Sequence, residues 1–376
     1  MLMKRSTVFY AIAGALLVTY LALTILQLHT VSGWLLALFF VCLAMAFRSN
    51  RFLKGLSFTV IIFAAVTIAL YHPGYFQRWG SLALSDLIIP LIQIIMFGMG
   101  TAMSLKDFAG VVKQPKGVLI GVLSQFTIMP LLGFTLASLS SFPPEIAAGI
   151  VLIGCSPSGL ASNVMSYLAK ANLALSITIT SITTLLAPFV TPVLMKLLAG
   201  ALVEIEVFKM MWEIIKMIII PIGAGLLFNR LLRGRSKWLD DAMPIVSMAG
   251  IAFILVIIVA AGRDSLLTIG PALIGLVLIH NTCGYLLGYW SGRLFGMPES
   301  DCRTIAIEVG MQNGGLASGI AKEMGKIATV GLAPAVFGPL MNVTGSALAS
   351  WWHNRQPKEK PLDNKNLKQQ AHSSLS

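Results

Sequence analysis

Apolar segments long enough to cross a lipid bilayer recur along almost the whole chain. A transmembrane helix needs about 20 mainly apolar residues, and only helices and closed barrels satisfy their backbone hydrogen bonds inside a bilayer. Twelve segments fit or approach this length: 8–28, 33–47, 56–71, 87–103, 117–139, 146–168, 173–195, 208–228, 243–261, 271–290, 305–324 and 327–352. We therefore predict an all-α polytopic membrane protein.

The composition excludes the common soluble classes. Only 11% of the 376 residues are charged, whereas soluble domains carry roughly 25%. The net charge of +12 would also suit a nucleic-acid-binding protein. However, the basic residues lie between apolar segments on alternate sides, as orientation signals do. The lipid bilayer is thus the expected partner, and nucleic acid is not.

The distribution of lysine and arginine predicts how the chain is oriented. Basic residues mark the N-terminus, the loops near residues 48–54, 106–116, 170, 230–237 and 293, and the tail, whereas loops 138–145 and 200–206 have none. Twelve spans with both termini in the cytoplasm satisfy this pattern. Four basic residues then fall on the outer side as exceptions: Arg78, Arg263, Lys322 and Lys326.

Short sequence matches at one spacing indicate an internal duplication. Gly-Leu-Ala-Ser at 159–162 recurs at 315–318, Leu-Leu-Gly at 131–133 recurs at 286–288, and Gln125 falls on Asn281. If the unit begins at the third span, each copy has five helices, so the second copy enters the membrane inverted. Inverted repeats with discontinuous helices are typical of secondary transporters.

This organisation divides the chain into three parts. Residues 1–54 form an additional N-terminal transmembrane hairpin, and residues 55–352 form a transport domain with repeats at about 55–200 and 207–352. Residues 353–376 lack apolar periodicity, so we expect a disordered cytoplasmic tail.

A polar stretch at 305–318 lies inside one of the apolar segments. It holds Glu308, Gln312 and Asn313, together with Gly310, Gly314 and Gly315. An ionisable group at membrane depth is costly and marks a functional site. Glycines weaken a helix, and unwound backbone is tolerated there only if it is buried in protein or lines a watery cavity. Glu308 is therefore the first candidate for a functional centre.

A second interruption occupies the repeat-related stretch 154–163. Pro157, flanked by Gly154 and Gly159 and followed by Ser162-Asn163, is expected to break the helix. A break exposes carbonyls on one side and a helix N-terminus on the other, which attract cations and anions respectively. The alternative is a kinked packing helix whose small residues allow close approach. The paired interruption favours the functional interpretation.

Oxygen-bearing side chains near these breaks suit a hard cation such as sodium. Ser176 and Thr180 are four residues apart and so share one helix face, although such hydroxyls also often bond their own backbone. Leu332 and Val336 occupy the related positions in the second repeat. Hydroxyls on one side only predict a single asymmetric ion site.

Four ordered motifs resemble the bile acid:sodium symporter family, particularly its bacterial members. They are Gln-Phe-Thr-Ile-Met-Pro at 125–130, the run 162–169, His-Asn at 280–281 before 284–288, and Glu-Val-Gly-Met-Gln-Asn at 308–313. The resemblance covers about residues 56–352. It implies two inverted five-helix repeats, a panel domain and a core domain, fourth and ninth helices that cross where they unwind, and a bacterial inner membrane.

The resemblance also implies roles for individual residues. A first sodium site would use Ser162, Asn163, Ser176, Thr180 and Glu308. A second would use Gln125, Glu308 and Gln312 with the carbonyls of Val309 and Met311. Asn313 resembles a substrate-contacting position.

The expected substrate cavity departs from the family pattern. Bacterial relatives often carry Gly-Gly-Thr before the Ser-Asn pair, whereas this chain has Ser158-Gly159-Leu160, followed by Ala161. Near the last helix, a position that can be histidine is Met341, before Asn342. We expect Leu160, Ala161, Met341 and Asn342 to line the cavity beside Asn313, so neither bile acid nor pantoate follows from the resemblance alone.

The sequence therefore predicts a sodium-coupled symporter of an organic anion that works by alternating access. The anion would be bile acid-like, pantoate-like or another carboxylate or sulfonate, with sodium as the coupling ion and no cofactor. Two alternatives remain: proton coupling through Glu308, or a membrane receptor that binds the anion without carrying it. An enzyme is not expected, because the sequence has neither a His-Glu metal spacing nor a nucleophile elbow.

Overall fold

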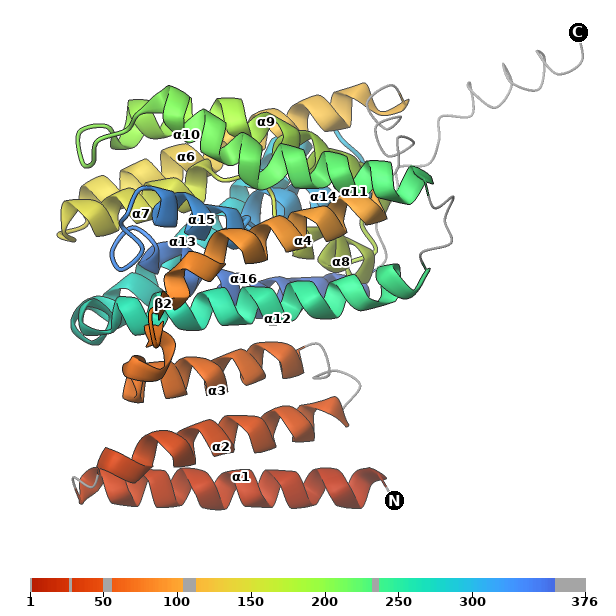
Figure 1. The fold of residues 1–376 in the computed structure, drawn as a ribbon. Coiled ribbons are helices and arrows are strands. Elements are labelled where there is room, and N and C mark those ends of the chain that lie inside the picture. The colour runs from red at the N-terminus through yellow and green to blue at the C-terminus, as the bar shows by residue number, and fades with distance from the viewer. Residues whose placement is uncertain (1, 27–28, 50–55, 104–112, 232–236, 356–376) are drawn as a thin grey trace, which may run out of the picture.

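The computed structural model describes residues 2–26, 29–49, 56–103, 113–231 and 237–355, which are almost entirely helical (Figure 1). The helices are α1 (Leu2–Ile25), α2 (His29–Arg48), α3 (Ser57–Tyr71), α4 (Ile88–Ala102), α6 (Pro115–Leu139), α7 (Pro144–Cys155), α8 (Ala161–Leu168), α9 (Leu173–Ala199), α10 (Val207–Ile214), α11 (Ile220–Leu231), α12 (Lys237–Ala261), α13 (Arg263–Leu294), α14 (Glu299–Gly310), α15 (Gly314–Glu323) and α16 (Leu332–His353). A π-helical turn, η5 (Ile215–Ile219), joins α10 to α11, and short 3₁₀ turns η2 (Pro73–Phe76) and η3 (Leu84–Leu87) flank a small hairpin.

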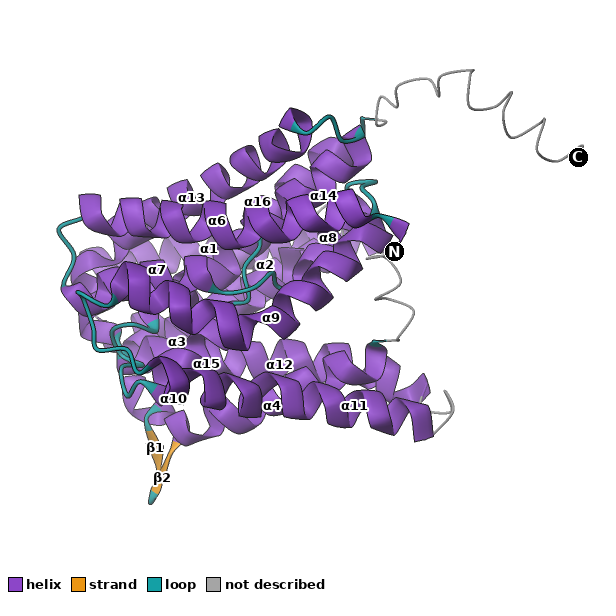
Figure 2. Ribbon diagram, turned by 90° about the horizontal axis from the view of Figure 1, so that it is seen from above, coloured by secondary structure: helices purple, strands orange, loops and turns teal. Residues whose placement is uncertain are grey.

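The prediction of an all-α polytopic membrane protein is confirmed. Seven helices in the described ranges are long and apolar enough to cross a membrane, and further apolar helices are shorter. The hairpin pairs β1 (Arg78–Trp79) with β2 (Leu82–Ala83) in antiparallel register, and it is the only strand pair among the described residues. It connects α3 to α4 outside the helical layers (Figure 2).

The helices fall into two groups by their packing. In the first, which we call the core bundle, α6, α7, α8, α9, α13, α14, α15 and α16 pack on one another. In the second, the flanking layer, α12 packs on α3 and α4, α4 packs on α11, and α10 leads into α11 through η5. Figure 2 shows α4, α11 and α12 along one side of the molecule and α6, α13 and α14 along the other.

The N-terminal hairpin extends the flanking layer. Helix α1 packs on α2, and α2 packs on α3, so the three helices lie as successive layers in Figure 1. The hydroxyl groups of Tyr20 and Tyr71 are 3.1 Å apart, and the Trp34 ring stacks on His72 with a centroid distance of 5.3 Å. The predicted hairpin 1–54 thus has described helices at 2–25 and 29–48, whereas residues 50–54 lie outside the described residues.

The end of the bundle that holds the β1–β2 hairpin, opposite the start of α1, is called the distal end here (Figure 1). The basic residues that the sequence places there have local partners. Arg263 pairs with Asp264 at 3.0 Å, Lys322 pairs with Asp86 at 2.8 Å, and Lys326 pairs with Glu145. The guanidinium of Arg78 donates to the Ser81 carbonyl oxygen. These contacts explain how basic side chains are accommodated at this end.

The predicted boundaries of the last helix and of the tail shift in the structure. The last apolar segment, predicted at 327–352, begins its helix only at Leu332, because turns occupy the residues before it and Gly325 has a φ of +68°. Helix α16 continues through His353, whose Nδ1 lies 2.8 Å from the Leu168 carbonyl oxygen. Residues 356–376 of the predicted tail lie outside the described residues.

Candidate functional site

Two discontinuous helices cross in the middle of the core bundle. The first is interrupted between α7 and α8, and the second between α14 and α15. At the crossing, Gly159 N–H donates to the Met311 carbonyl and Asn313 N–H donates to the Pro157 carbonyl, both at 2.8 Å. Ser158 and Gln312 therefore face each other in a short antiparallel bridge. Both interruptions lie where the glycines, Pro157 and polar residues of the sequence predict them.

Glycines make this close approach possible. A Cβ on Gly159 would lie 2.6 Å from the Gln312 carbonyl oxygen, and one on Gly310 would lie 2.1 Å from a ring carbon of Tyr285. Real Cβ atoms do not approach other atoms so closely. A larger residue at 159 would push the two crossing segments apart, and one at 310 would push α14 away from the Tyr285 ring on α13.

Glu308, near the end of α14, is completely buried beside the crossing. Its Oε1 accepts hydrogen bonds from Ser162 at 2.6 Å and from Ser176 at 2.5 Å, and its Oε2 accepts one from Thr180 at 2.8 Å. The Oδ1 of Asn163 lies 2.9 Å from the Ser176 hydroxyl oxygen. The structure thus brings all five predicted residues of the first sodium site into one cluster.

The chemistry of this cluster suits a hard cation. Its inward-facing atoms are a carboxylate, an amide oxygen and three hydroxyls, and oxygen ligands are what such cations prefer. None of the ion pairs formed by the described residues includes Glu308. A buried carboxylate without a basic partner requires a cation or a proton as its counter-charge.

The residues predicted for the second sodium site lie on the other side of the bridge. Gln125 Nε2 donates to Gln312 Oε1 at 2.8 Å, and Gln312 Nε2 donates to the Val309 carbonyl at 2.6 Å. The Met311 carbonyl accepts the bridge hydrogen bond from Gly159. The structure joins Gln125, Gln312 and Val309 here, whereas the carboxylate of Glu308 contacts the first cluster.

Two serines in these clusters were not predicted as ligands. Ser158 Oγ donates to the Glu308 carbonyl at 3.1 Å and lies 3.4 Å from Gln125 Oε1, so it links the two clusters. Ser166 Oγ lies 3.1 Å from Ser176 Oγ. Ser166 lies four residues after Ser162 and so shares its helix face, which is the signal that could have identified it.

The predicted substrate residues lie around the N-termini of α8 and α15. Leu160 precedes α8 and is 36% exposed, and Ala161 begins that helix. Asn313 caps α15, since its Oδ1 accepts from Leu316 N–H at 3.0 Å. Its Nδ2 has no hydrogen-bond acceptor among the described residues, which leaves this donor available to a ligand.

Met341 and Asn342 lie on α16, the helix that packs along the crossing. One turn before them, Gly338 faces Gly314 at the start of α15, and in the turn after them Gly345 faces the Met311 side chain. The structure therefore places both residues between two points of contact with the second broken helix.

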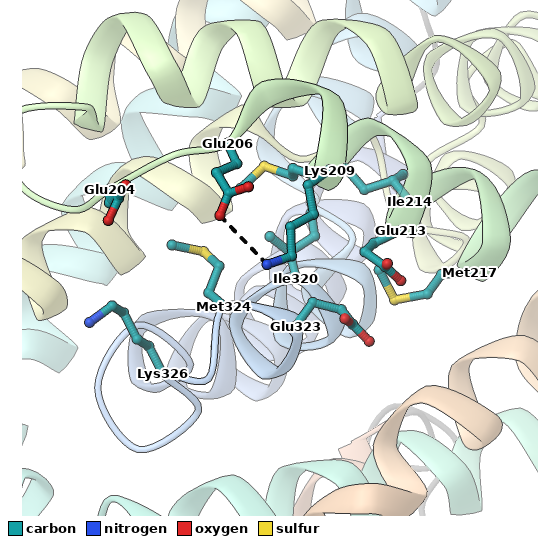
Figure 3. Close-up of a pocket in the computed structure, with 11 residues that line it drawn as sticks. Glu204, Glu206, Lys209, Glu213, Ile214, Met217, Ile320, Glu323, Met324 and Lys326 are labelled. Carbon is teal, nitrogen blue, oxygen red and sulfur yellow. Dashed lines mark ion pairs between the residues drawn. The ribbon is translucent and has the colours of Figure 1, made fainter.

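A cavity of about 210 Å³ lies apart from these residues, at the distal end between α10 and α15 (Figure 3). Its lining combines methionines and isoleucines with charged groups from both helix groups, including Glu213, Lys209 and Glu323. Lys209 pairs with Glu206 at 3.6 Å, as Figure 3 shows. None of the predicted sodium or substrate residues lines this cavity. Because it lies between α10 and α15, the cavity is at the boundary between the core bundle and the flanking layer.

Comparison with known proteins identifies similar chains. Residues 89–269 match the family described as "Sodium Bile acid symporter family". The chain is 38% identical over 313 residues to the "Uncharacterized sodium-dependent transporter YocS" of Bacillus subtilis (strain 168), covering 83% of this chain and 95% of that protein.

Plant proteins are also similar. The "Probable sodium/metabolite cotransporter BASS1, chloroplastic" of Arabidopsis thaliana is 31% identical over 268 residues, which is 71% of this chain and 67% of that protein. The corresponding BASS5 protein of the same plant is 33% identical over 305 residues, which is 78% and 74% of the two chains.

Proposed function

The chain belongs to the sodium bile acid symporter family, and from this premise we propose that it carries a small organic anion together with sodium ions by alternating access. It is a multi-pass membrane transporter with sodium as its coupling ion, and it is not an enzyme. The proposal concerns the anion, the residues that bind each solute and the conformational cycle.

The Glu308 cluster is the observation that carries this proposal. A fully buried carboxylate is surrounded by oxygen donors from α8 and α9, with hydrogen bonds of 2.5–2.8 Å from three hydroxyls. Sodium bound here would balance the carboxylate charge and join α14 to α8 and α9. A second ion held by Gln125, Gln312 and the carbonyls of Val309 and Met311 would give the site a net positive charge.

The half-helix ends support an anionic substrate. The N-termini of α8 and α15 both lie at the crossing, and a helix N-terminus carries partial positive charge and unpaired N–H groups. Together with Asn313 Nδ2 and the net positive charge of a two-sodium site, they favour a carboxylate or sulfonate. Leu160 and Met341, at positions where relatives can have polar residues, favour a substrate with an apolar part beside its acidic group.

The packing between the two helix groups supports alternating access. At the distal end, α15 of the core bundle packs on α4 and α10 of the flanking layer. The Lys322 ammonium reaches across to Asp86 at 2.8 Å and to the Ser85 hydroxyl at 3.0 Å. Toward the end of the molecule opposite the distal end, α8 packs on α9, α14 and α16 within the core bundle, while α11 packs on α4 within the flanking layer. We assign this arrangement to a state closed at the distal, outer end, with both termini in the cytoplasm of a bacterial cell.

Reversing the charge of Lys322 should favour opening of the distal end. An ion pair this exposed contributes at most about 1 kcal/mol, so we expect Lys322→Glu to raise distal accessibility about threefold to fivefold. The measurement is the rate at which an impermeant maleimide labels Ile320→Cys, which lines the distal cavity, with the four native cysteines replaced by serine.

The reversed pair supplies the decisive comparison. Adding Asp86→Lys to Lys322→Glu should return the labelling rate to its starting value. Arg293→Glu is the matched control, because Arg293 pairs with Glu299 within the core bundle, does not line the cavity and does not bridge the two groups. Equal labelling in all variants would contradict the assignment.

The function is tested first by ligand screening and then by flux. Purified protein is heated with a panel of carboxylates and sulfonates in sodium chloride or in potassium chloride, since ligands that bind the folded state raise the Tm. Anions that stabilise only in sodium are then tested for uptake into proteoliposomes. We expect uptake to require an inward sodium gradient. Uptake driven by a proton gradient alone would support proton coupling through Glu308, and binding without uptake would support a receptor.

A further inference from the structure

A buried amide on α13 joins the second break to α16. Asn281 is fully buried, and its Nδ2 donates to the Gly310 carbonyl, the last in α14, at 2.8 Å. Its Oδ1 accepts from the Thr344 hydroxyl at 2.6 Å. One side chain therefore connects three helices of the core bundle.

The carbonyl that Asn281 holds lies between two proposed sodium ligands. The last carbonyls of a helix lack helical donors and need other partners. At the end of α14, Gln312 Nε2 donates to Val309, Asn281 to Gly310, and Gly159 N–H to Met311. Successive carbonyls belong to linked peptide planes, so fixing the middle carbonyl constrains the directions of both neighbours.

At the first broken helix an amide side chain also holds a carbonyl beside the break, but its second partner is different. Gln125 on α6 donates to the Ser156 carbonyl, just after α7, at 2.9 Å. It lies 156 residues before Asn281. Gln125 extends to Gln312 within the proposed second sodium site, whereas Asn281 extends to Thr344 on α16. The amide of the second repeat thus faces a helix expected to contact the substrate.

Thr344 contacts backbone carbonyls of α16 near Met341. Its hydroxyl also lies 3.1 Å from the Leu340 carbonyl and 3.2 Å from the Met341 carbonyl, and Tyr285 OH donates to the same Met341 carbonyl at 3.2 Å. A shift of α16 near Met341 would therefore alter the hydrogen bond that orients Asn281.

We propose that Asn281 and Thr344 are positioning residues that couple α16 to the sodium-binding carbonyls at the end of α14. This inference rests on the proposed function, because it assigns those carbonyls to sodium. In this arrangement, an anion that fixes α16 strengthens sodium binding. Sodium strengthens anion binding by the same factor, since coupling between two sites is reciprocal.

The test uses the full-length chain and sodium alone as the probe. The Tm is measured against sodium chloride concentration, with potassium chloride keeping the ionic strength constant. Thr344→Val removes the hydroxyl with little change in shape, and we expect it to raise the sodium concentration needed for a given increase in Tm about threefold to tenfold. Asn281→Ala should raise it at least as much. Thr344→Ser, which keeps the hydroxyl, should respond as the unchanged chain does.

Thr67→Val provides the matched control. Thr67 is a threonine whose hydroxyl donates to the Phe63 carbonyl within α3, away from the crossing. A purely structural role for Thr344 would lower the Tm in potassium and leave unchanged the sodium concentration needed for a given increase in Tm, which would overturn the inference. If Thr344→Val does not fold, Thr344→Ala removes the same hydroxyl with less bulk. A lack of any sodium response in the unchanged chain would overturn the proposed function, and this inference with it.

Discussion

Glu308→Gln should abolish sodium binding at the Glu308 cluster while leaving the fold intact. Glutamine keeps the shape of the side chain but removes the only carboxylate in the cluster, so a bound cation loses its counter-charge in a buried, low-dielectric site. We expect the sodium affinity to fall at least 100-fold, which corresponds to about 2.7 kcal/mol. Binding of ²²Na⁺ to the purified protein measures this without knowledge of the anion, and sodium-driven uptake should be lost with it.

Glu145→Gln is the control for this experiment. Glu145 is a carboxylate of the same bundle, but it lies at the distal end, where it pairs with Lys326 and accepts a hydrogen bond from Thr329 at 2.6 Å. Its loss should lower the Tm and leave ²²Na⁺ binding unchanged. If Glu308→Gln bound sodium as well as the unchanged chain, the cluster would not be the coupling site. The proton-coupled alternative would then gain support.

Gly159→Ala should disrupt both proposed sodium sites through the backbone. Its Cβ would lie 2.6 Å from the Gln312 carbonyl oxygen, so the two crossing backbone segments would have to separate. The Gly159–Met311 hydrogen bond would then lengthen or break. Overpacking of this kind destabilises proteins by roughly 1–3 kcal/mol, and here the displaced atoms are themselves proposed ligands. We expect a lower Tm and at least a tenfold loss of sodium affinity by the same binding assay.

The matched substitution is Gly275→Ala. Gly275 lies in α13, and a Cβ built there meets nothing within 4 Å. Alanine is the better helix former by about 1 kcal/mol, so this variant should fold and bind sodium normally. If Gly159→Ala also folded and bound sodium normally, the close crossing of the two backbone segments would not be required for ion binding.

The sequence predicts the helices and their interruptions well because both follow from local chemistry. Long apolar runs predict the spans, and Pro157 with its neighbouring glycines predicts the first break, which the structure places after Cys155. The spacing of Ser176 and Thr180 predicts one shared face, and both hydroxyls donate to Glu308. These features depend on residues within one or two turns of each other.

Other contacts depend on how distant segments meet, so sequence patterns do not reveal them. Ser158 contacts Gln125 and the Glu308 carbonyl only because the two breaks cross. Likewise, the bond between Asn281 and Thr344 follows from the packing of α13 on α16. Helix α16 also starts later than its hydropathy suggests, because apolar residues such as Ile327 lie in turns that pack against the bundle. Hydropathy reports burial but does not distinguish a buried turn from a buried helix.

The antiparallel bridge at the crossing has a consequence for how transporters of this type can diversify. Its two 2.8 Å hydrogen bonds join main-chain atoms, so they form whatever side chains stand beside them, provided that glycine remains at 159. Substitutions at Leu160, Ala161 or Met341, the proposed substrate-contacting residues, can therefore alter which anion is bound while the proposed sodium ligands keep their positions. The transported anion can in this way change during evolution while the coupling to sodium is retained.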